Sequence, residues 1–193
     1  MARTTVFVDD YSDFPEEALL AKRDLLDQAV GRWRQTSYHY SWKSTRLPSR
    51  LAGTLSWRKV CEGGVCFLEQ PEEWPNVVLQ AGDEHWRDVR MTTTVTPLGG
   101  ARCGVLFRYQ SSRHNYFLAF EDLRRVALYR RQDDELVLLA ARPLAYAPGA
   151  PRAVTVVAEG SSLRAAVDGG GALEVDDAAY LRGSIGLRSD GPV

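Results

Sequence analysis

Side chains near the middle of the chain have the chemistry of a ligand-binding surface. Arg108 carries a planar guanidinium group, while Gln110 and Asn115 carry amides that both donate and accept hydrogen bonds. Tyr116 and Tyr129 add flat apolar rings. Such a mixture suits vicinal hydroxyls and the apolar face of a sugar ring. The predicted ligand set is Arg108, Gln110, Asn115, Tyr116, Tyr129, Trp74 and Arg90. The alternative is that Arg108 pairs with a carboxylate such as Glu121 on an ordinary solvent-facing sheet.

Catalytic and metal-binding patterns are weaker. His39, His85 and His114 are isolated from one another and fall in predicted loops, so we expect surface histidines. The sequence contains no Gly-x-Ser-x-Gly, phosphate-loop or His-Glu-x-x-His motif. The acidic residues Asp9, Asp10 and Asp13 suggest a weak calcium site, and a polar turn that caps a helix is the competing interpretation.

The chain has three cysteines. Cys61 and Cys66 flank a predicted turn and either form a small disulfide, if the protein is exported, or remain two reduced thiols. Zinc is not expected, because no second Cys or His pair lies nearby. Cys103 stands in an apolar strand and is predicted to be a small core residue.

Composition indicates one ordinary globular domain. The 193 residues have a net charge of −1, with 45% hydrophobic and 25% charged residues, so no overall field would attract nucleic acid or an acidic membrane. The N-terminus has no apolar signal-peptide core, and no stretch approaches the length of a membrane span. The compartment and the oligomeric state stay open.

Three consecutive antiparallel strands are predicted in the central stretch Ala101–Arg131, at 103–109, 116–120 and 126–129. Side chains alternate between the two faces of a strand. Val105, Phe107 and Tyr109 are therefore predicted to face the core, and Leu106, Arg108 and Gln110 to share the other face. In the next strand, the side chains of Tyr116, Leu118 and Phe120 are predicted to point to one face, and those of Asn115, Phe117 and Ala119 to the other.

Similar apolar runs between turn residues continue on both sides of this stretch. They predict strands at 55–60, 65–69, 77–79, 86–96, 135–141, 153–158, 163–167, 172–175 and 185–188. A first strand is predicted at Thr4–Val8 and an amphipathic helix at Pro15–Arg34. The fold class is therefore all-β: a two-sheet antiparallel β-sandwich, or jelly roll, with one inserted N-terminal α-helix.

The order of these features resembles the concanavalin A-like lectin/glucanase superfamily, in its laminin-G-like branch, including the 3-keto-disaccharide hydrolase-type domain. The resemblance covers roughly 55–188 and residues 7–12. It is carried by the hairpin of Trp57 and Gly64-Val65, Trp86-Arg-Asp-Val89, Gly104-Val-Leu-Phe-Arg-Tyr109, Asn115-Tyr116, Val126-Ala-Leu-Tyr-Arg130, Val167-Asp-Gly169 and Gly183-Ser-Ile-Gly-Leu-Arg188.

Two departures from this resemblance affect what it implies. A helical and aromatic insertion at about 14–54 separates the first strand from the hairpin. The family's usual closing strand is missing after Ser189, so we expect either an uncapped first strand or a fragment of a longer protein. Glucanase-type members carry Glu-x-Asp-x-x-Glu, whereas here Ala179 replaces the second Glu of Glu174-Val-Asp176-Asp177. Asp176 and Asp177 are accordingly predicted to be loop acids.

The resemblance implies a non-catalytic carbohydrate-binding or adhesion module, whose partners would be a glycan and neighbouring domains of a larger secreted or cell-surface bacterial protein. One alternative is a divergent glycoside hydrolase of the 3-keto-disaccharide hydrolase type, with loop acids such as Glu121, Asp122 or Asp88. Another is a structural domain that packs on a neighbouring domain, which an exposed patch at Leu19, Leu26 and Trp33 would favour.

Overall fold

The computed structural model describes residues 28–30, 33–37, 57–70, 77–191 and 193. These segments form fourteen β-strands. The strands are β1 (Gln28–Val30), β2 (Trp33–Ser37), β3 (Arg58–Glu62), β4 (Val65–Glu69), β5 (Val77–Ala81), β6 (Val89–Val95), β7 (Cys103–Ser111), β8 (His114–Glu121), β9 (Arg125–Gln132), β10 (Glu135–Pro143), β11 (Arg152–Glu159), β12 (Ser162–Val167), β13 (Leu173–Asp176) and β14 (Ser184–Ser189).

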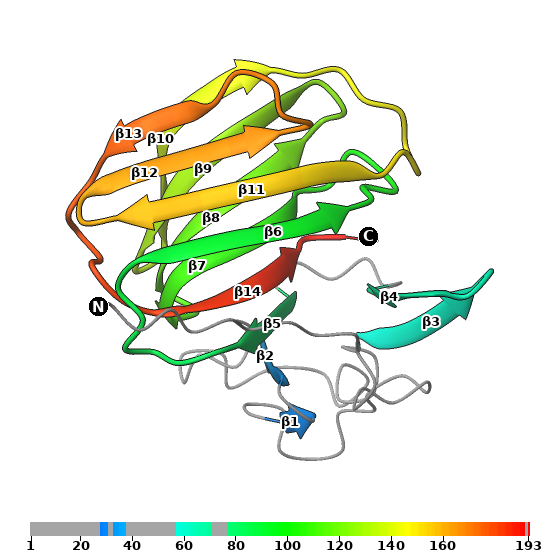
Figure 1. The fold of residues 1–193 in the computed structure, drawn as a ribbon, viewed down its shortest axis with the longest axis horizontal. Coiled ribbons are helices and arrows are strands. Elements are labelled where there is room, and N and C mark those ends of the chain that lie inside the picture. Colours follow the sequence, from blue (N-terminus) through cyan, green and yellow to red (C-terminus); the bar gives the residue numbers. More distant parts are fainter. Residues whose placement is uncertain (1–27, 31–32, 38–56, 71–76, 192) are drawn as a thin grey trace, which may run out of the picture.

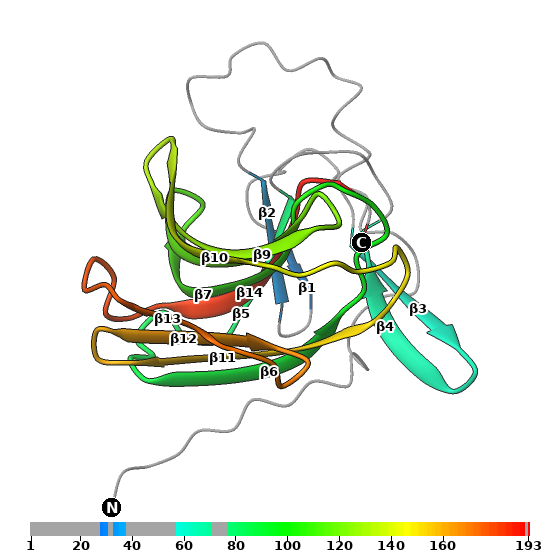
Figure 2. The same ribbon diagram turned by 90° about the horizontal axis from the view of Figure 1, so that it is seen from above.

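The strands form two facing antiparallel sheets and one separate hairpin. The large sheet has eight strands in the order β1-β2-β5-β14-β7-β8-β9-β10, and the small sheet has four in the order β13-β12-β11-β6. Figure 2 shows the small sheet lying against one face of the large sheet, with the β3–β4 hairpin projecting to one side. The predicted all-β sandwich is confirmed.

The main hydrophobic core fills the space between the two sheets. Phe107 and Leu118 of the large sheet belong to the same buried cluster as Val154, Val156 and Leu163 of the small sheet. Strand β6 shows how the sequence specifies this arrangement, since Val89, Met91 and Val95 are buried while Arg90, Thr92 and Thr94 between them are exposed. The core positions predicted for Val105, Phe107 and Cys103 are confirmed.

The second face of the large sheet is also buried over its central strands. Leu106, Tyr109, Phe117 and Tyr129 belong to a second apolar cluster on this face, and Phe117 is 0% exposed. The apolar runs of β7 and β8 are thus buried on both faces. This face is therefore not the open ligand platform that strand alternation predicted.

A β-bulge interrupts the alternation in β7. Between the pairs Leu106–Gly186 and Tyr109–Ser184, two residues of β7 stand opposite one residue of β14, and Arg108 has a φ of 47°. The extra residue turns Tyr109 to the second face, so its predicted place in the main core is wrong. Gly183 permits the close approach, because a Cβ there would lie 2.3 Å from the carbonyl carbon of Arg108.

The predicted helix at Pro15–Arg34 is wrong in its last part. Residues 28–30 form β1, and residues 33–37 form β2, which pairs with β5 along its whole length. Sheet pairing therefore overrides the local helical spacing here. The remainder of that helix, the strand predicted at Thr4–Val8, the patch residues Leu19 and Leu26, and most of the insertion lie outside the described residues.

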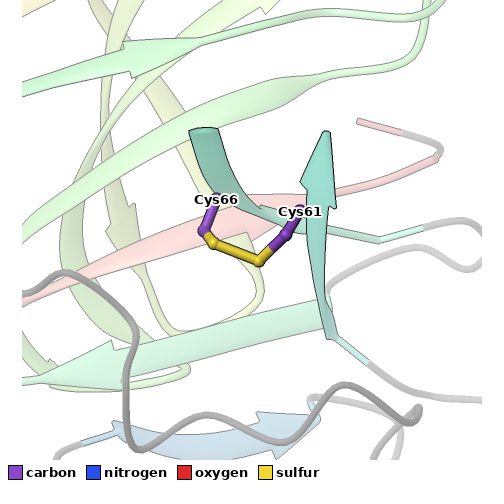
Figure 3. Close-up of a disulfide and its surroundings, with 2 residues drawn as sticks. All are labelled: Cys61 and Cys66. Carbon is purple, nitrogen blue, oxygen red and sulfur yellow. A yellow bond between two sulfur atoms is a disulfide. The ribbon is translucent and has the colours of Figure 1, made fainter. Parts of the chain in front are cut away.

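The β3–β4 hairpin turns at Gly63-Gly64, as predicted, and a disulfide joins its strands. Cys61 and Cys66 are directly opposite each other in the pairing register, and their side chains meet across the hairpin (Figure 3). The structure thus favours the disulfide over two reduced thiols. Beyond β4, the backbone of Gln70 exchanges two hydrogen bonds with that of Val193. The described part of the chain contains no helix long and apolar enough to cross a membrane.

Candidate functional site

Arg108 is fully buried and binds protein backbone. Its Nε and one terminal nitrogen donate to the carbonyl oxygen of Arg87 at 3.3 and 3.2 Å, and its other terminal nitrogen donates to that of Tyr180 at 3.0 Å. Burial lowers the pKa of Arg108 below its ordinary value. The predicted solvent-facing position is wrong, because the bulge turns this side chain towards the chain segments that precede β6 and β14. The alternative pairing with Glu121 is not formed either.

Tyr116 and Asn115 are also buried rather than exposed to a ligand. The ring of Tyr116 stacks on Phe107 with 5.4 Å between centroids, and Tyr116 is 0% exposed. Asn115 is 2% exposed, and its amide donates to the carbonyl oxygen of Ser111. Neither side chain can contact a ligand without a rearrangement of the strands.

The other members of the predicted ligand set are dispersed. Gln110 is exposed at the end of β7, and its amide donates to the carbonyl oxygen of Arg182. Arg90 lies on the outer face of the small sheet, and Tyr129 lies buried on the second face of the large sheet. Trp74 and the proposed calcium ligands Asp9, Asp10 and Asp13 lie outside the described residues. Within the described segments, no group of three or more potential metal ligands is found.

A buried polar network closes one end of the sandwich. The Tyr116 hydroxyl donates to Asp177 Oδ1 at 2.7 Å and accepts the backbone N–H of Tyr180 at 3.2 Å. Arg130 forms an ion pair with Asp177, whose side chain is 8% exposed. Burial alone would raise the pKa of Asp177, but the bonds from Tyr116 and the Ala179 N–H, together with Arg130, lower it overall. Burial, followed by the bond to Asp177, raises the pKa of Tyr116. These contacts fix the loop that contains Asp177.

A Ser-His-Asp arrangement at the same end does not have the contacts of a nucleophile. Ser111 Oγ lies 3.3 Å from His114 Nδ1, and His114 Nε2 lies 3.4 Å from Asp133 Oδ1. However, Ser111 Oγ already accepts the backbone N–H groups of Arg113 and His114 at 3.2 and 3.1 Å. The hydroxyl therefore caps the β7–β8 turn, and both distances exceed the usual reach between a nucleophile and its base.

The opposite end of the sandwich is built around the β8–β9 turn. Asp122 and Leu123 both have positive φ, at 53° and 57°, which makes a tight turn between Glu121 and Arg125. The Leu123 side chain packs against the main core. Backbone bonds tie the turn to its neighbours: Asp122 N–H donates to Gly100, Leu144 N–H to Arg124, and Tyr146 N–H to Leu123.

These bonds bring three connections together. Gly100 belongs to the β6–β7 connection, and Leu144 and Tyr146 belong to the β10–β11 connection. A further bond, from the Gly149 N–H to the Pro97 carbonyl oxygen at 2.8 Å, joins those two connections directly. Figure 1 shows both connections at the right-hand end of the two-sheet sandwich, above the β3–β4 hairpin. Backbone hydrogen bonds with the β6–β7 and β10–β11 connections therefore hold the β8–β9 turn in place on two sides.

Glu121 anchors a cluster of side chains beside this turn, which we call the Glu121 cluster (Glu121, Arg102, Arg125 and Tyr129). The Glu121 carboxylate is 2% exposed and accepts Nε of Arg102 at 2.5 Å and Nε of Arg125 at 2.7 Å. The Tyr129 hydroxyl lies 2.8 Å from both carboxylate oxygens. Burial and then the bond to Glu121 raise the pKa of Tyr129, and the bond to Glu121 raises that of Arg125.

The two arginines of the cluster remain partly exposed. The side chains of Arg102 and Arg125 are 46% and 44% exposed, respectively. An open hollow of about 560 Å³ lies next to Arg125 and is lined, among the described residues, by Asp122, Arg124 and Arg125. We take this hollow and the Glu121 cluster together as the candidate functional site. It contains none of the predicted ligand residues except Tyr129.

Sequence reasoning did not single out Arg102, Arg124 or Arg125. The proximity of Glu121 to Arg125 across the turn could have been predicted from the sequence, because the two residues flank a short turn between predicted strands. The position of Arg102 could not have been predicted. It depends on how the β6–β7 connection packs on the β8–β9 turn.

Of the three acids considered for glycoside cleavage, Glu121 and Asp122 belong to this site and Asp88 does not. Glu121 is buried, and each of its oxygens is bonded to an arginine and to Tyr129. Asp88 precedes β6, whereas Gly100, which binds the β8–β9 turn, follows it. The length of β6, about 20 Å at 3.3 Å per residue, separates the two positions. Because the two carboxyl groups of a glycosidase lie within about 10 Å of each other, Asp88 is too far away to form such a pair with an acid of this site.

The comparisons with known proteins concern the fold. No family model matches the chain, and no curated protein matches it. Among solved structures, the carbohydrate-binding module CBM66 from Bacillus subtilis is similar, with a TM-score of 0.62 and 14% identity over 70% of this chain and 84% of that one. The GH43 protein BlXynB from Bacillus licheniformis matches with a TM-score of 0.50 and 14% identity over 97% of this chain. This chain covers 37% of BlXynB. These similarities are to sandwich folds, and the superfamily itself stays a prediction.

Proposed function

We propose that this domain is a non-catalytic saccharide-binding module and that the saccharide binds in the hollow beside the β8–β9 turn. The observation that carries the proposal is the hollow itself, whose volume of about 560 Å³ falls within the usual range for small-molecule sites. It is bordered by polar side chains on the β8–β9 turn, which backbone hydrogen bonds hold in place. The likeness to CBM66 supports the proposal at the level of the fold.

The arginines suit this role because the buried carboxylate fixes their orientation. Each uses its Nε to bind Glu121, which leaves terminal N–H groups at the partly exposed ends of Arg102 and Arg125. Guanidinium N–H groups in a fixed fork can bind two neighbouring hydroxyl oxygens. A prearranged donor set loses less conformational entropy when it binds.

The non-catalytic part of the proposal rests on the acids. The Glu121 carboxylate already accepts hydrogen bonds from side chains of its own cluster. Asp88 precedes β6, at the end of that strand away from the hollow. The hollow itself is lined by one carboxylate, Asp122, among the described residues, whereas glycoside cleavage ordinarily uses two. We further propose an exported bacterial protein as the setting. The Cys61–Cys66 disulfide supports export, because disulfides persist in oxidising compartments.

The test is a titration of the ¹⁵N-labelled domain with a panel of neutral and acidic oligosaccharides, monitored through backbone amide shifts. At least one saccharide should shift the amides of Gly100, Asp122 and Arg124 in a saturable way. The amides of Arg90 and Gln110 should stay in place and serve as internal controls. If no saccharide binds, or if the shifts gather around Gln110 instead, the proposed site is wrong.

A further inference from the structure

We infer that the saccharide carries a carboxylate, as a uronic acid does, and that Arg124 and Arg125 bind this group. This inference rests on the proposed function and adds the chemical class of the ligand. It follows from the charges and donors around the hollow, which differ from what a neutral sugar requires.

The site holds more cationic than anionic groups that a ligand can reach. Arg124 and Arg125 line the hollow, and Arg102 is bound to Glu121 in the neighbouring cluster; two carboxylates, Glu121 and Asp122, accompany the three arginines. Glu121 is buried and already paired, so Asp122 is the one exposed carboxylate that lines the hollow in the described part of the chain. An approaching ligand therefore meets a surplus of positive charge.

The donors of these arginines are also available. Within the described residues, the side chain of Arg124 makes no hydrogen bond or ion pair, and the terminal nitrogens of Arg102 make no hydrogen bond. Arg125 is held through Nε and, more weakly, through a terminal nitrogen 3.4 Å from the Tyr129 hydroxyl. A planar carboxylate is the partner that a guanidinium fork binds most specifically, through two parallel N–H bonds.

Aromatic stacking, the usual means of holding a neutral sugar ring, is not supplied by the described lining. Tyr129 and Tyr146 lie near the turn but are 5% and 6% exposed. The exposed large hydrophobic residues of the described segments are Val65, Phe67, Leu98, Leu138 and Leu181, and none of them lines the hollow. Recognition here therefore depends on charge and hydrogen bonds.

The test compares two ligands that share a trisaccharide backbone and differ in whether their carboxyl groups are charged or methyl-esterified. Trigalacturonate and its fully methyl-esterified form are titrated into the domain by calorimetry in 50 mM NaCl. Trigalacturonate should bind about tenfold more tightly than the ester, and 500 mM NaCl should remove most of that difference. Arg124→Gln should weaken the binding of trigalacturonate about five- to tenfold. Arg182→Gln, an exposed arginine near β14 at the opposite end, should change it less than twofold.

The outcomes separate the two proposals. If the ester or another neutral glycan binds as tightly as trigalacturonate, and Arg124→Gln has no effect, the acidic ligand is wrong while saccharide binding stands. If a sulfated trisaccharide binds more than tenfold more tightly than trigalacturonate, the anionic group is a sulfate and the carboxylate is wrong. If neither neutral nor acidic saccharides bind, both proposals are overturned. Arg124 is the variant of choice because Arg125 also supports Glu121.

Discussion

Replacing Arg108 with methionine tests whether this residue supports the fold or a ligand. The Arg108→Met substitution keeps a long unbranched side chain but removes all the N–H donors of the guanidinium group. The carbonyl oxygens of Arg87 and Tyr180 would then lose their side-chain donors at the bulge. Because Arg108 is 0% exposed, water cannot replace these donors without opening the structure.

The expected loss of stability follows from these two acceptors. An unsatisfied buried acceptor costs about 1–3 kcal/mol, so two would cost about 2–6 kcal/mol. Part of this cost is offset, because the variant no longer buries a cation whose pKa is lowered by desolvation. We therefore expect a decrease of about 3 kcal/mol in the free energy of unfolding. With a urea m-value of about 2 kcal/mol/M, the midpoint would fall by about 1.5 M.

The assay is urea unfolding followed by fluorescence, with Arg90→Met as the matched control. Arg90 is exposed on β6, so the same substitution there should change the free energy of unfolding by less than about 0.5 kcal/mol. If Arg108→Met and Arg90→Met have equally small effects, the reasoning from the buried bonds is refuted. A stable Arg108→Met variant that lost saccharide binding would restore the ligand role predicted from the sequence.

Two further substitutions probe other parts of the domain. Asp177→Asn should lower stability at pH 7 by about 2 kcal/mol, because the carboxylate accepts charge-assisted hydrogen bonds. The folded pKa of Asp177 is lowered from 3.8, so this contribution is present above about pH 4 and disappears as the pH falls further. A wild-type advantage in urea that did not shrink between pH 7 and pH 3 would contradict this. The Cys61→Ser/Cys66→Ser variant should destabilise its hairpin locally by about 2 kcal/mol. Hydrogen exchange should accelerate in β3 and β4 while the global urea midpoint stays within about 0.5 M, and an equal loss of protection throughout the sandwich would argue against a separate hairpin.

The strands could be predicted because their signals are local. Apolar runs bounded by Gly, Ser, Asn and Asp located β7, β8 and β9, and the two glycines at 63–64 located the turn between β3 and β4. The alternation of β6 even indicated which of its faces is buried. These signals depend on neighbouring residues along the chain, so a single sequence contains them.

The faces of β7 could not be predicted, because a bulge is decided by the partner strands. Its position depends on the close approach of Gly183 and on the carbonyl oxygens that receive the guanidinium of Arg108. Strict alternation therefore failed at Arg108 and Tyr109, although it held for Val105 to Phe107. The helical spacing before Arg34 failed for a related reason, since β2 pairs with β5 from far along the chain.

The two ends of the sandwich use arginine in opposite ways, and this difference bears on function. At one end, Arg108 and Arg130 bind backbone or a mostly buried carboxylate, so their donors hold loops in place. At the other end, Glu121 binds Arg102 and Arg125 through Nε and leaves their terminal groups partly exposed, those of Arg125 beside the hollow. A residue needed for stability is ordinarily saturated by protein partners, whereas a binding residue must keep donors for its ligand. Substitutions at the first end should therefore change stability, and substitution of Arg124 should change binding with little change in stability.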